Sequence, residues 1–298
     1  MAVHLETTEK LVTPQQEVSS YRRYQAKRIG KTTTQLIVNI AVVGFVLFPL
    51  VYAVLMSLKT PGEIYTSELN LFPDVPQFSN YAEAFRIAPL GQYIVNSFIV
   101  AGFITLGQLI TGAFAAFSFH FLNYKGKDIL FSLVMATMMV PGEATIISNY
   151  IQVSSWGWLD SYKVLIIPYL TSATTIFLFR QFYKNFPMSL YESAKIDGAS
   201  NARFLFQILL PLTKPAIGAV AVNAFINAWN MYMWPLLVTG SDQYRTVQIG
   251  VSMMNSIDSQ SIVLMLAGVV VCLIPSLLIF VFGQKSLVRG LMSGSVKG

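Results

Sequence analysis

The sequence predicts an all-α membrane protein with six transmembrane helices, both termini in the cytoplasm, and a cytoplasmic helix–turn–helix between the fourth and fifth spans. Hydrophobic residues make up 54% of its 298 residues, and charged residues make up 11%. A water-soluble core of that size cannot cover so much apolar side chain, so the excess must face lipid. The apolar segments also lack the roughly ten-residue alternation of a membrane β-barrel.

The six predicted spans are apolar segments, each near the roughly 20 residues that a helix needs to cross a bilayer core. Short polar stretches separate them and leave little room for a soluble domain. We therefore expect a cytoplasmic N-terminal tail over residues 1–35, a six-helix domain over 36–283, and a cytoplasmic C-terminal tail over 284–298. The spans are residues 36–58, 93–119, 130–151, 164–183, 216–239 and 262–282.

The N-terminal 35 residues are polar and contain no short apolar core ahead of a small-residue cleavage site. We therefore expect no removable signal peptide, and the first helix remains as an anchor. The one cysteine, Cys272, lies inside the last span, so the sequence predicts no disulfide framework.

The distribution of basic residues predicts the orientation, because Lys and Arg in short loops are retained on the cytoplasmic side. Of the 20 basic residues, 16 fall in the two tails, in the loop after the second span, or between residues 180 and 214. Both termini are therefore predicted to be cytoplasmic, and the net charge of +6 reflects topology rather than binding to nucleic acid. The other four are Lys59, Arg86, Lys163 and Arg245.

Two outward-facing loops are long enough to bind a partner. Residues 60–92 are rich in proline and turn-forming residues, and residues 240–261 form the other loop. One interpretation is that both simply connect helices. The other is that they form a docking rim for an external protein.

The stretch ESAKIDGAS at residues 192–200 is the polar centre of the predicted helix–turn–helix. Pro187 suits a first helical turn and Ser189 suits a cap, while Gly198 permits a turn that most residues resist. A second helical piece is predicted to end at Pro211 and Pro215. An ordinary amphipathic helix at the membrane surface would also fit. The predicted exposed charges are Glu192, Lys195, Asp197 and Arg203.

The segment PMSLYESAKIDGASNARFLFQILLPLTKP resembles the cytoplasmic EAA loop of permease subunits in binding-protein-dependent ABC importers. Ser193 departs from the family pattern, which has alanine there, but the two residues are close in size. The resemblance covers residue 36 to the C-terminus. The matching residues are Pro187, Leu190, Glu192, Ala194, Asp197, Gly198, Ala199, Phe204, Ile208, Pro211 and Pro215.

Other segments resemble the carbohydrate-uptake branch of these permeases, which includes maltose, multiple-sugar and glycerol-3-phosphate permeases. They are AWNMYMWPLL at 228–237 and QKSLVRGLMSGSVKG at 284–298. LDSY at 159–162 and SATTIFLFRQF at 172–182 are most similar to glycerol-3-phosphate permeases but recur in oligosaccharide permeases. The resemblance therefore identifies the type of transporter better than the solute that it carries.

The resemblance implies a transport subunit that moves a sugar, an oligosaccharide or a solute like glycerol-3-phosphate into the cell by alternating access. It implies a second homologous permease, two ATPase subunits that bind ATP and Mg²⁺, and an extracytoplasmic solute-binding protein, in a bacterial or archaeal cytoplasmic membrane. No cofactor is expected on this chain itself. The residues implied to contact the ATPase are Glu192, Ala194, Lys195, Asp197, Gly198, Ala199, Arg203 and Phe204.

No motif in the sequence predicts catalysis. The segment from Gly30 to Thr32 lacks the earlier glycine of a P-loop, and Gln284-Lys285-Ser286 fails in the same way. His4 and His120 are too far apart in sequence for a familiar metal-binding spacing. The chain is therefore not expected to be an enzyme, and ATP hydrolysis is expected on separate subunits.

Two features are candidates for the cargo pathway. Glu143 is the one acidic residue inside a predicted span, beside Pro141 and Gly142, which loosen the helix. It either lines the translocation cavity, or reaches the outer interface or a neighbouring subunit. Asn223, Asn227 and Asn230 share one face of the fifth span, with Trp229, Tyr232 and Trp234 nearby. Amides and aromatic rings suit sugars, but amides also join helices.

Two rival hypotheses remain at this point. A proton-coupled secondary transporter would use Glu143 as the carrier, and would need inverted repeats or further buried charges, which the sequence does not show. A structural scaffold would leave uptake unaffected when the chain is lost. Small residues one turn apart in the second span, Gly112 and Ala116, also predict close packing of helices.

Overall fold

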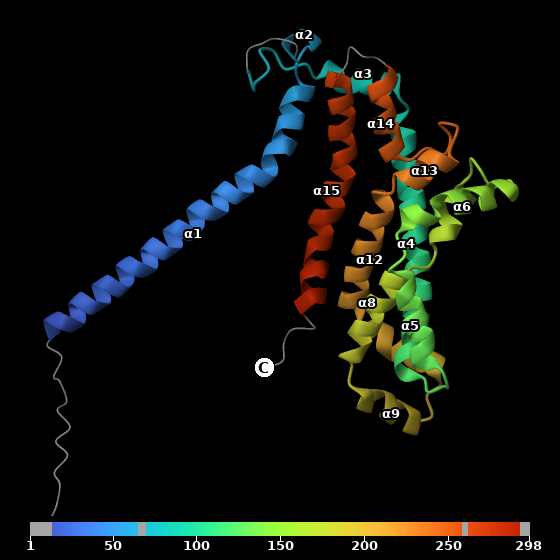
Figure 1. Cartoon of the computed structure of the whole chain (residues 1–298). Coiled ribbons are helices and arrows are strands. Elements are labelled where there is room, and N and C mark those ends of the chain that lie inside the picture. Colours follow the sequence, from blue (N-terminus) through green and yellow to red (C-terminus); the bar gives the residue numbers. More distant parts are fainter. Residues whose placement is uncertain (1–13, 65–69, 258–261, 293–298) are drawn as a thin grey trace, which may run out of the picture. The chain divides into compact units, whose positions relative to one another are not determined.

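The computed structural model describes residues 14–64, 70–257 and 262–292, which Figure 1 shows as coloured ribbon. These residues form helices joined by short turns, and none of them lies in a strand. The chain divides into two compact units, one ending at Ala53 and one beginning at Val54. The first predicted span lies mainly in the first unit, and the other five lie in the second.

The first unit is built on α1 (Pro14–Ser57), a single helix whose portion Lys31–Ser57 is long and apolar enough to cross a membrane. The predicted span over 36–58 falls within it except for its last residue. The helix begins well before residue 36, because the polar residues ahead of the span include many Gln, Lys and Arg, which favour helix. From residue 31 onward most of its apolar side chains are exposed, as expected for a face toward lipid; Phe45, for example, is 84% exposed, whereas Met56 near the end of the helix is buried.

The second unit contains two long helices, α4 (Leu90–Phe121) and α15 (Ile262–Met292), and both match predicted spans. Helix α12 (Lys214–Trp229) packs against both of them, and α8 (Ala173–Lys184) packs against α4 (Figure 1). A Cβ atom at Gly112 of α4 would lie 2.7 Å from Thr175 Cγ2 of α8. This confirms the close packing predicted for Gly112.

The other spans are broken rather than continuous. The predicted third span is α5 (Lys127–Thr137) followed by α6 (Gly142–Ser155), with a bend of 91° between them. The fourth is α7 (Tyr162–Ile166) and η1 (Ile167–Tyr169), which bend by 40° into α8. Each pair is long and apolar enough to count as one span, so the described helices provide between three and six membrane spans.

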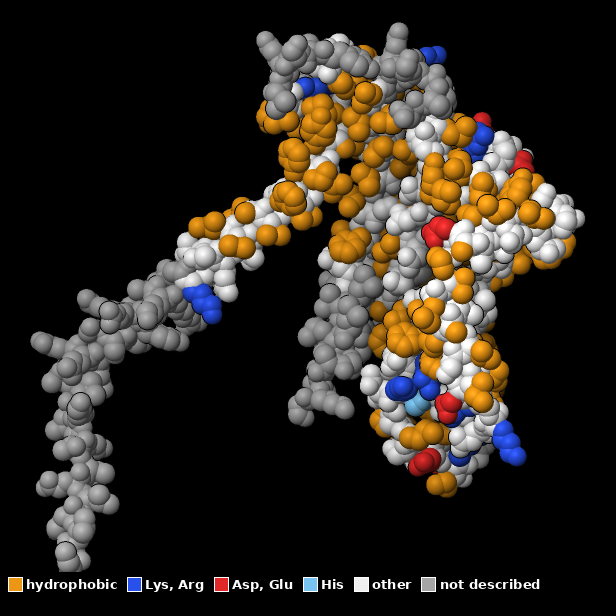
Figure 2. Space-filling view, viewed as in Figure 1, with side chains coloured by type: hydrophobic (Ala, Val, Ile, Leu, Met, Phe, Trp, Pro, Cys, Tyr) orange, Lys and Arg blue, Asp and Glu red, His pale blue; other side chains and the backbone are white. Residues whose placement is uncertain are grey.

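The predicted fifth span is also interrupted. Helix α12 ends at Trp229, and α13 (Met233–Val238) follows after a break. Before α12, the helical run Asn201–Leu212 meets it at 81°. Figure 2 shows most charged side chains of the second unit toward its two ends, with apolar and uncharged side chains and an acidic group between them. That distribution fits a bundle whose middle lies in lipid.

Short helices lie at the end of the unit opposite α9 (Met188–Ile196), in the segments predicted to face outward (Figure 1). They are α2 (Pro61–Ile64), α3 (Ser79–Ile87) and α14 (Val247–Ile257). Helix α3 packs against α15, and α14 packs against α15 and α4. The outer segments therefore contain folded helices docked on the bundle.

Asp160 holds the start of the second outer segment. Its backbone N–H donates to Val238 O at 2.8 Å, and its carboxylate accepts from the backbone N–H groups of Gly240 and Ser241 at 3.0 Å each. These bonds, led by the one from Ser241, lower the pKa of Asp160 below its ordinary value. The residue adopts a left-handed conformation with φ of 54°, which Asp tolerates better than most residues.

Candidate functional site

The predicted helix–turn–helix is present between α8 and α12. Its first helix, α9, ends in a Schellman motif: the N–H of Ala199 donates to Ala194 O at 2.8 Å, and the N–H of Gly198 donates to Lys195 O at 3.1 Å. Gly198 has a φ of +78°, in the left-handed region that favours glycine. This confirms the turn predicted at Gly198.

The second helical piece starts with a side-chain cap. Ser200 Oγ accepts a hydrogen bond from the backbone N–H of Arg203 at 3.2 Å at the start of α10 (Asn201–Phe204). The Tyr191 hydroxyl donates to Asn201 Oδ1 at 2.9 Å, which ties α9 to α10 across the turn. The Arg203 side chain donates to Gln207 at 3.0 Å. These contacts make the two pieces one rigid element.

One predicted boundary of this element is wrong, while the end predicted at Pro211 and Pro215 matches the end of the helical run Asn201–Leu212 to within one residue. Pro187, with an extended ψ of 120°, occupies the position before α9, so Ser189 lies inside the helix and does not cap it. The second piece continues as a π-helical turn, η2 (Leu205–Leu209), and then α11 (Leu210–Leu212). Pro211 is tolerated because it falls in the first turn of α11, where a missing N–H costs little.

Phe204 anchors the element to the spans. Its side chain is fully buried, at 0% exposure. The centroid of the Phe204 ring lies 4.9 Å from that of Tyr191, 5.4 Å from that of Phe121 in α4, and 6.1 Å from that of Phe186, which follows α8. Ala194 of α9 is buried in the same cluster. The element is therefore packed against the end of α4 and against the segment that follows α8.

The opposite face of α9 is exposed and mixed in character. Glu192, Lys195 and Asp197 are all exposed, as the sequence predicted, and so is Arg203 on α10. Ile196 is 87% exposed, a feature that the sequence interpretation missed. Isoleucine is usually buried, so nothing in the sequence indicated that Ile196 would be exposed beside Lys195 and Asp197. The face therefore combines charges with one prominent apolar side chain.

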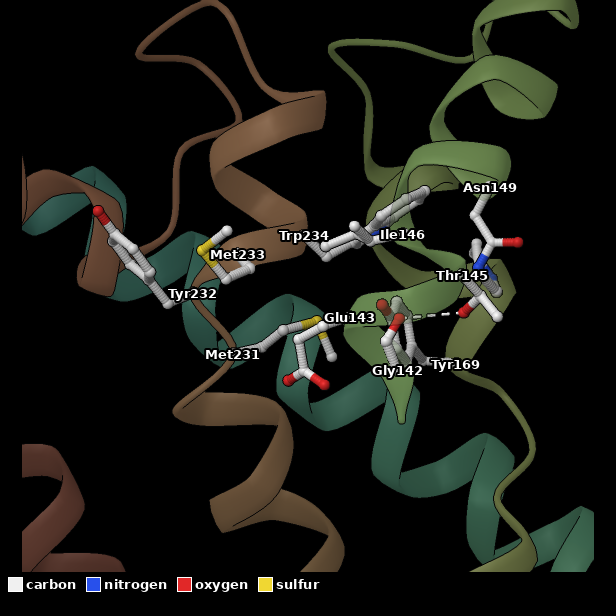
Figure 3. A pocket seen from close by; sticks show the side chains of 11 residues that line it. Gly142, Glu143, Thr145, Ile146, Asn149, Tyr169, Met231, Tyr232, Met233 and Trp234 are labelled. Carbon is white, nitrogen blue, oxygen red and sulfur yellow. Dashed lines mark hydrogen bonds between the residues drawn. The ribbon is translucent and has the colours of Figure 1, made fainter. Parts of the chain in front are cut away.

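A cavity of about 390 Å³ lies where the broken spans meet. It is lined from three sides: by the first turns of α6, by η1, and by the break between α12 and α13. Figure 3 shows the Glu143 carboxylate directed toward Met231, between α6 and that break. The lining residues are Gly142, Glu143, Thr145, Ile146, Asn149, Pro168, Tyr169, Met231, Tyr232, Met233 and Trp234.

Two predicted pathway residues, Glu143 and Tyr232, line the cavity, and Figure 3 shows the Tyr232 ring directed away from Glu143. The backbone also breaks where Pro141 and Gly142 were expected to loosen it. The hydroxyl of Thr145 donates to Gly142 O at 3.0 Å, the contact drawn in Figure 3. Trp234 and Tyr169 form an edge-to-face pair at 6.1 Å, so one wall is aromatic.

The predicted asparagine face is only partly preserved. Asn227 donates to the backbone and side-chain oxygens of Asn223, at 2.9 and 3.1 Å, and both residues are exposed on α12. Asn230 lies just past the end of that helix and accepts from Gln248 at 3.4 Å. Trp229 is buried, at 2% exposure, and packs against Phe98 and Phe225. Its ring belongs to the packed core of the bundle.

The nucleotide-like and metal-like motifs lie in settings unsuited to those ligands. Gly30-Lys31-Thr32 lies within α1, and Gln284-Lys285-Ser286 lies within α15, so neither forms a loop. His120 lies at the end of α4, and His4 falls outside the described residues. Across residues 14–64, 70–257 and 262–292, no three His, Cys, Asp or Glu side chains cluster as metal ligands would.

Comparison with known sequences relates the chain to transport permeases. The family described as "Binding-protein-dependent transport system inner membrane component" matches residues 108–292. The arabinooligosaccharides transport system permease protein AraQ of Bacillus subtilis (strain 168) is 33% identical over 255 residues, which are 85% of this chain and 91% of that protein. The sn-glycerol-3-phosphate transport system permease protein UgpE of Brucella suis biovar 1 (strain 1330) is 35% identical over 268 residues, or 86% and 93% of the two chains.

Two solved structures share the fold. One is a bacterial ABC transporter involved in the import of the acidic polysaccharide alginate, with a TM-score of 0.74 at 20% identity, covering 87% of this chain and 97% of that chain. The other is a bacterial alginate ABC transporter in complex with alginate pentasaccharide-bound periplasmic protein. It has a TM-score of 0.59 at 16% identity and covers 87% and 94% of the two chains.

Proposed function

Since the chain belongs to the family of binding-protein-dependent transport system inner membrane components, we propose that it is one of two permease subunits of an ATP-driven ABC importer for a sugar, an oligosaccharide or a solute like glycerol-3-phosphate. The relatives named above are permease proteins of transport systems, and they match most of the chain. These comparisons favour the importer over the proton-coupled alternative. The chain is a transport subunit, and the ATP and Mg²⁺ belong to separate ATPase subunits.

The proposed topology has six spans with both termini in the cytoplasm. It counts each broken apolar helix pair as a single span, and it puts the ends rich in Lys and Arg inside. The element over residues 187–215 then lies on the inner surface of a bacterial or archaeal cytoplasmic membrane. The outer helices α3 and α14 face the solute-binding protein, for which the complex of the alginate transporter with its periplasmic protein is a precedent.

The observation that carries the proposal is the construction of the loop between α8 and α12. It is stiff, because a Schellman turn, a cap and the Tyr191–Asn201 hydrogen bond hold its two pieces together. It is anchored, because Phe204 is buried among rings of α4 and α9. A stiff, anchored element can transmit a displacement to the spans, whereas a flexible linker cannot.

The exposed face of this element is proposed to contact the ATPase subunit. Glu192, Lys195, Asp197 and Arg203 offer charged contacts, and Ile196 offers an apolar one that would be buried on docking. Ala194, Gly198 and Ala199 shape the turn that presents them. ATP binding closes the ATPase pair, which moves the element and switches the cavity between inward and outward access.

Two substitutions test this role. We expect Glu192→Ala to weaken coupling between ATP hydrolysis and uptake. We expect Gly198→Val to distort the turn, because a β-branched residue is strongly disfavoured at a φ of +78°. Ser193→Ala, which places the family's usual alanine beside Glu192, is the matched control and should behave as the wild type.

The measurements are ATP-dependent solute uptake by the reconstituted complex, and the amount of ATPase subunit that co-purifies with the chain. Normal uptake and normal assembly for both Glu192→Ala and Gly198→Val would contradict the proposed coupling role. Complete loss of uptake in the Ser193→Ala control would show that the loop tolerates no substitution at all. Glu192→Gln, which keeps the size of the side chain and removes its charge, would then test the role of Glu192.

A further inference from the structure

The cavity beside Glu143 lies where three segments of helix break. The bend between α5 and α6 contributes Gly142 and Glu143, the η1 turn contributes Pro168 and Tyr169, and the break after α12 contributes Met231 and Tyr232. Some backbone groups at such breaks lack the partner four residues away that a regular helix provides. Within a membrane they are tolerated only where protein buries them or where they line a water-filled space. Their convergence on one cavity indicates that this space holds water.

The size and chemistry of the cavity suit a polyhydroxylated ligand. Its volume of about 390 Å³ falls in the range of small-molecule pockets, roughly 300 to 1,000 Å³. The Glu143 carboxylate and the Asn149 amide are on exposed residues that line it. A carboxylate accepts hydrogen bonds from two hydroxyl groups at once, an amide both donates and accepts, and the partly exposed Tyr169 ring offers an apolar face to a sugar ring.

The charge of the cavity is one-sided. Glu143 is the one acidic residue among the described residues that line it, and none of those residues is Lys, Arg or His. Glu143 also forms no salt bridge with any residue in the described ranges. A cationic partner inside the protein would neutralise the carboxylate and make the cavity indifferent to charge. Without one, the cavity has a negative potential that a passing anion must overcome.

We propose that this cavity is a cargo-contact site that admits neutral polyhydroxylated solutes and disfavours anionic ones, with Glu143 as the specificity-determining residue. The proposal rests on the importer function and narrows its substrate class. The names of the relatives include an arabinooligosaccharide system and a glycerol-3-phosphate system, and they do not choose between these cargo types. The cavity favours the neutral oligosaccharide.

Thiol labelling in the complete importer measures the charge of the cavity without knowledge of the cargo. Thr145→Cys places a reactive group in the lining, two residues after Glu143, in a chain whose buried native thiol is removed by Cys272→Ala. A cationic and an anionic methanethiosulfonate reagent of similar size are compared. Two unit charges about 4 Å apart alter an equilibrium about five-fold even in bulk water, and more where the dielectric constant is lower.

The expected result is faster labelling by the cationic reagent. Glu143→Gln should lower the ratio of cationic to anionic rates by at least about five-fold. Asp128→Asn, which removes a carboxylate from the first turn of α5 in the same broken span, is the matched control and should leave the ratio unchanged. The proposal would be overturned if the ratio of cationic to anionic labelling rates were the same with and without Glu143→Gln. It would also be overturned if neither reagent labelled the cysteine.

Protection by solutes then tests the substrate class. Arabinotriose and sn-glycerol-3-phosphate serve as the neutral and anionic probes. We expect arabinotriose to slow labelling of Thr145→Cys, and glycerol-3-phosphate to slow it only after Glu143→Gln. The assignment would be refuted if glycerol-3-phosphate slowed labelling while Glu143 is still present. It would also be refuted if arabinotriose did not slow labelling. The importer function is judged separately, by ATP-dependent uptake in the wild type and its response to Glu192→Ala, so the two failures are distinguishable.

Discussion

Replacement of Phe204 by alanine should detach the loop from the spans. The side chain is 0% exposed and lies within 4.9 to 6.4 Å, between ring centroids, of Tyr191, Phe121, Phe186 and Phe117. A buried Phe→Ala change costs about 3 to 5 kcal/mol, since transfer energy and packing are lost together. If the loop bears that cost, its opening becomes more frequent by a factor of roughly 100 to 4,000.

Hydrogen exchange in the intact importer measures that opening. Amides of α9 and α10 should exchange faster by about that factor in Phe204→Ala, while amides in the middle of α4 keep their rates. ATP hydrolysis should continue with less solute moved per ATP, because the ATPase then displaces a loop that no longer pulls on α4 and α8. Both readouts come from the same preparation.

The matched control is Phe206→Ala in the same loop. Phe206 is 53% exposed and packs edge-to-face on Phe114 at 5.7 Å, so much less burial is lost. Equal exchange rates in the two variants would refute the reasoning, since burial of the Phe204 ring would then not hold the loop. Unchanged transport per ATP in Phe204→Ala, with faster exchange, would show that the anchor does not carry the force.

Two further predictions concern the bundle and its outer end. Gly112→Ala should lower thermal stability by about 1 to 3 kcal/mol, because the new Cβ would lie 2.7 Å from Thr175 Cγ2. Gly102→Ala on the same helix meets nothing within 4 Å, and should be neutral or stabilise by up to about 1 kcal/mol in thermal unfolding. In the folded protein the pKa of Asp160 is lowered, mainly by the hydrogen bond from the backbone N–H of Ser241. The ionised carboxylate therefore stabilises the fold at pH values above the pKa of an unfolded Asp, about 3.9, and this stabilisation is lost as the pH falls through the pKa of the folded state. Asp160→Asn should therefore reduce stability at pH 7 and flatten the acid side of the unfolding profile.

These predictions fail in recognisable ways. Equal melting temperatures for Gly112→Ala and Gly102→Ala would show that α4 and α8 separate enough to admit the methyl group. An unchanged acid profile in Asp160→Asn would show that the carboxylate does not hold the outer segment.

Most of the membrane architecture could be predicted from the sequence, because hydropathy reports directly on contact with lipid. Helix α4 follows the predicted span at 93–119 closely, and α15 begins with the predicted span at 262–282 but continues to Met292. Hydropathy does not report where the backbone breaks, since residues on either side of a break are equally apolar. Nothing in the hydropathy therefore indicated that α12 ends at Trp229, whereas Pro141 and Gly142 did indicate the break before α6.

The loop and the cavity differ in how far the sequence could predict them. Gly198 predicted the turn correctly, because only a glycine adopts its backbone conformation without strain. Trp229 and Tyr232 were equally plausible cargo contacts by residue type, yet one is buried in the core and the other lines the cavity. Aromatic rings suit both settings, so only the path of the backbone separates them. Ile196 was missed because apolar character predicts burial.

Cross-linking from position 196 in intact membranes tests the central claim most directly. Ile196→Cys, in a chain carrying Cys272→Ala, should form a cross-link with an ATPase subunit, at a yield that changes between the ATP-bound and nucleotide-free states. Phe78→Cys, at a position that is 72% exposed and lies at the opposite end, should form none. If position 196 instead reacts with a membrane-impermeant thiol reagent added from outside, and never joins an ATPase subunit, then the loop is not the element through which ATP hydrolysis drives transport.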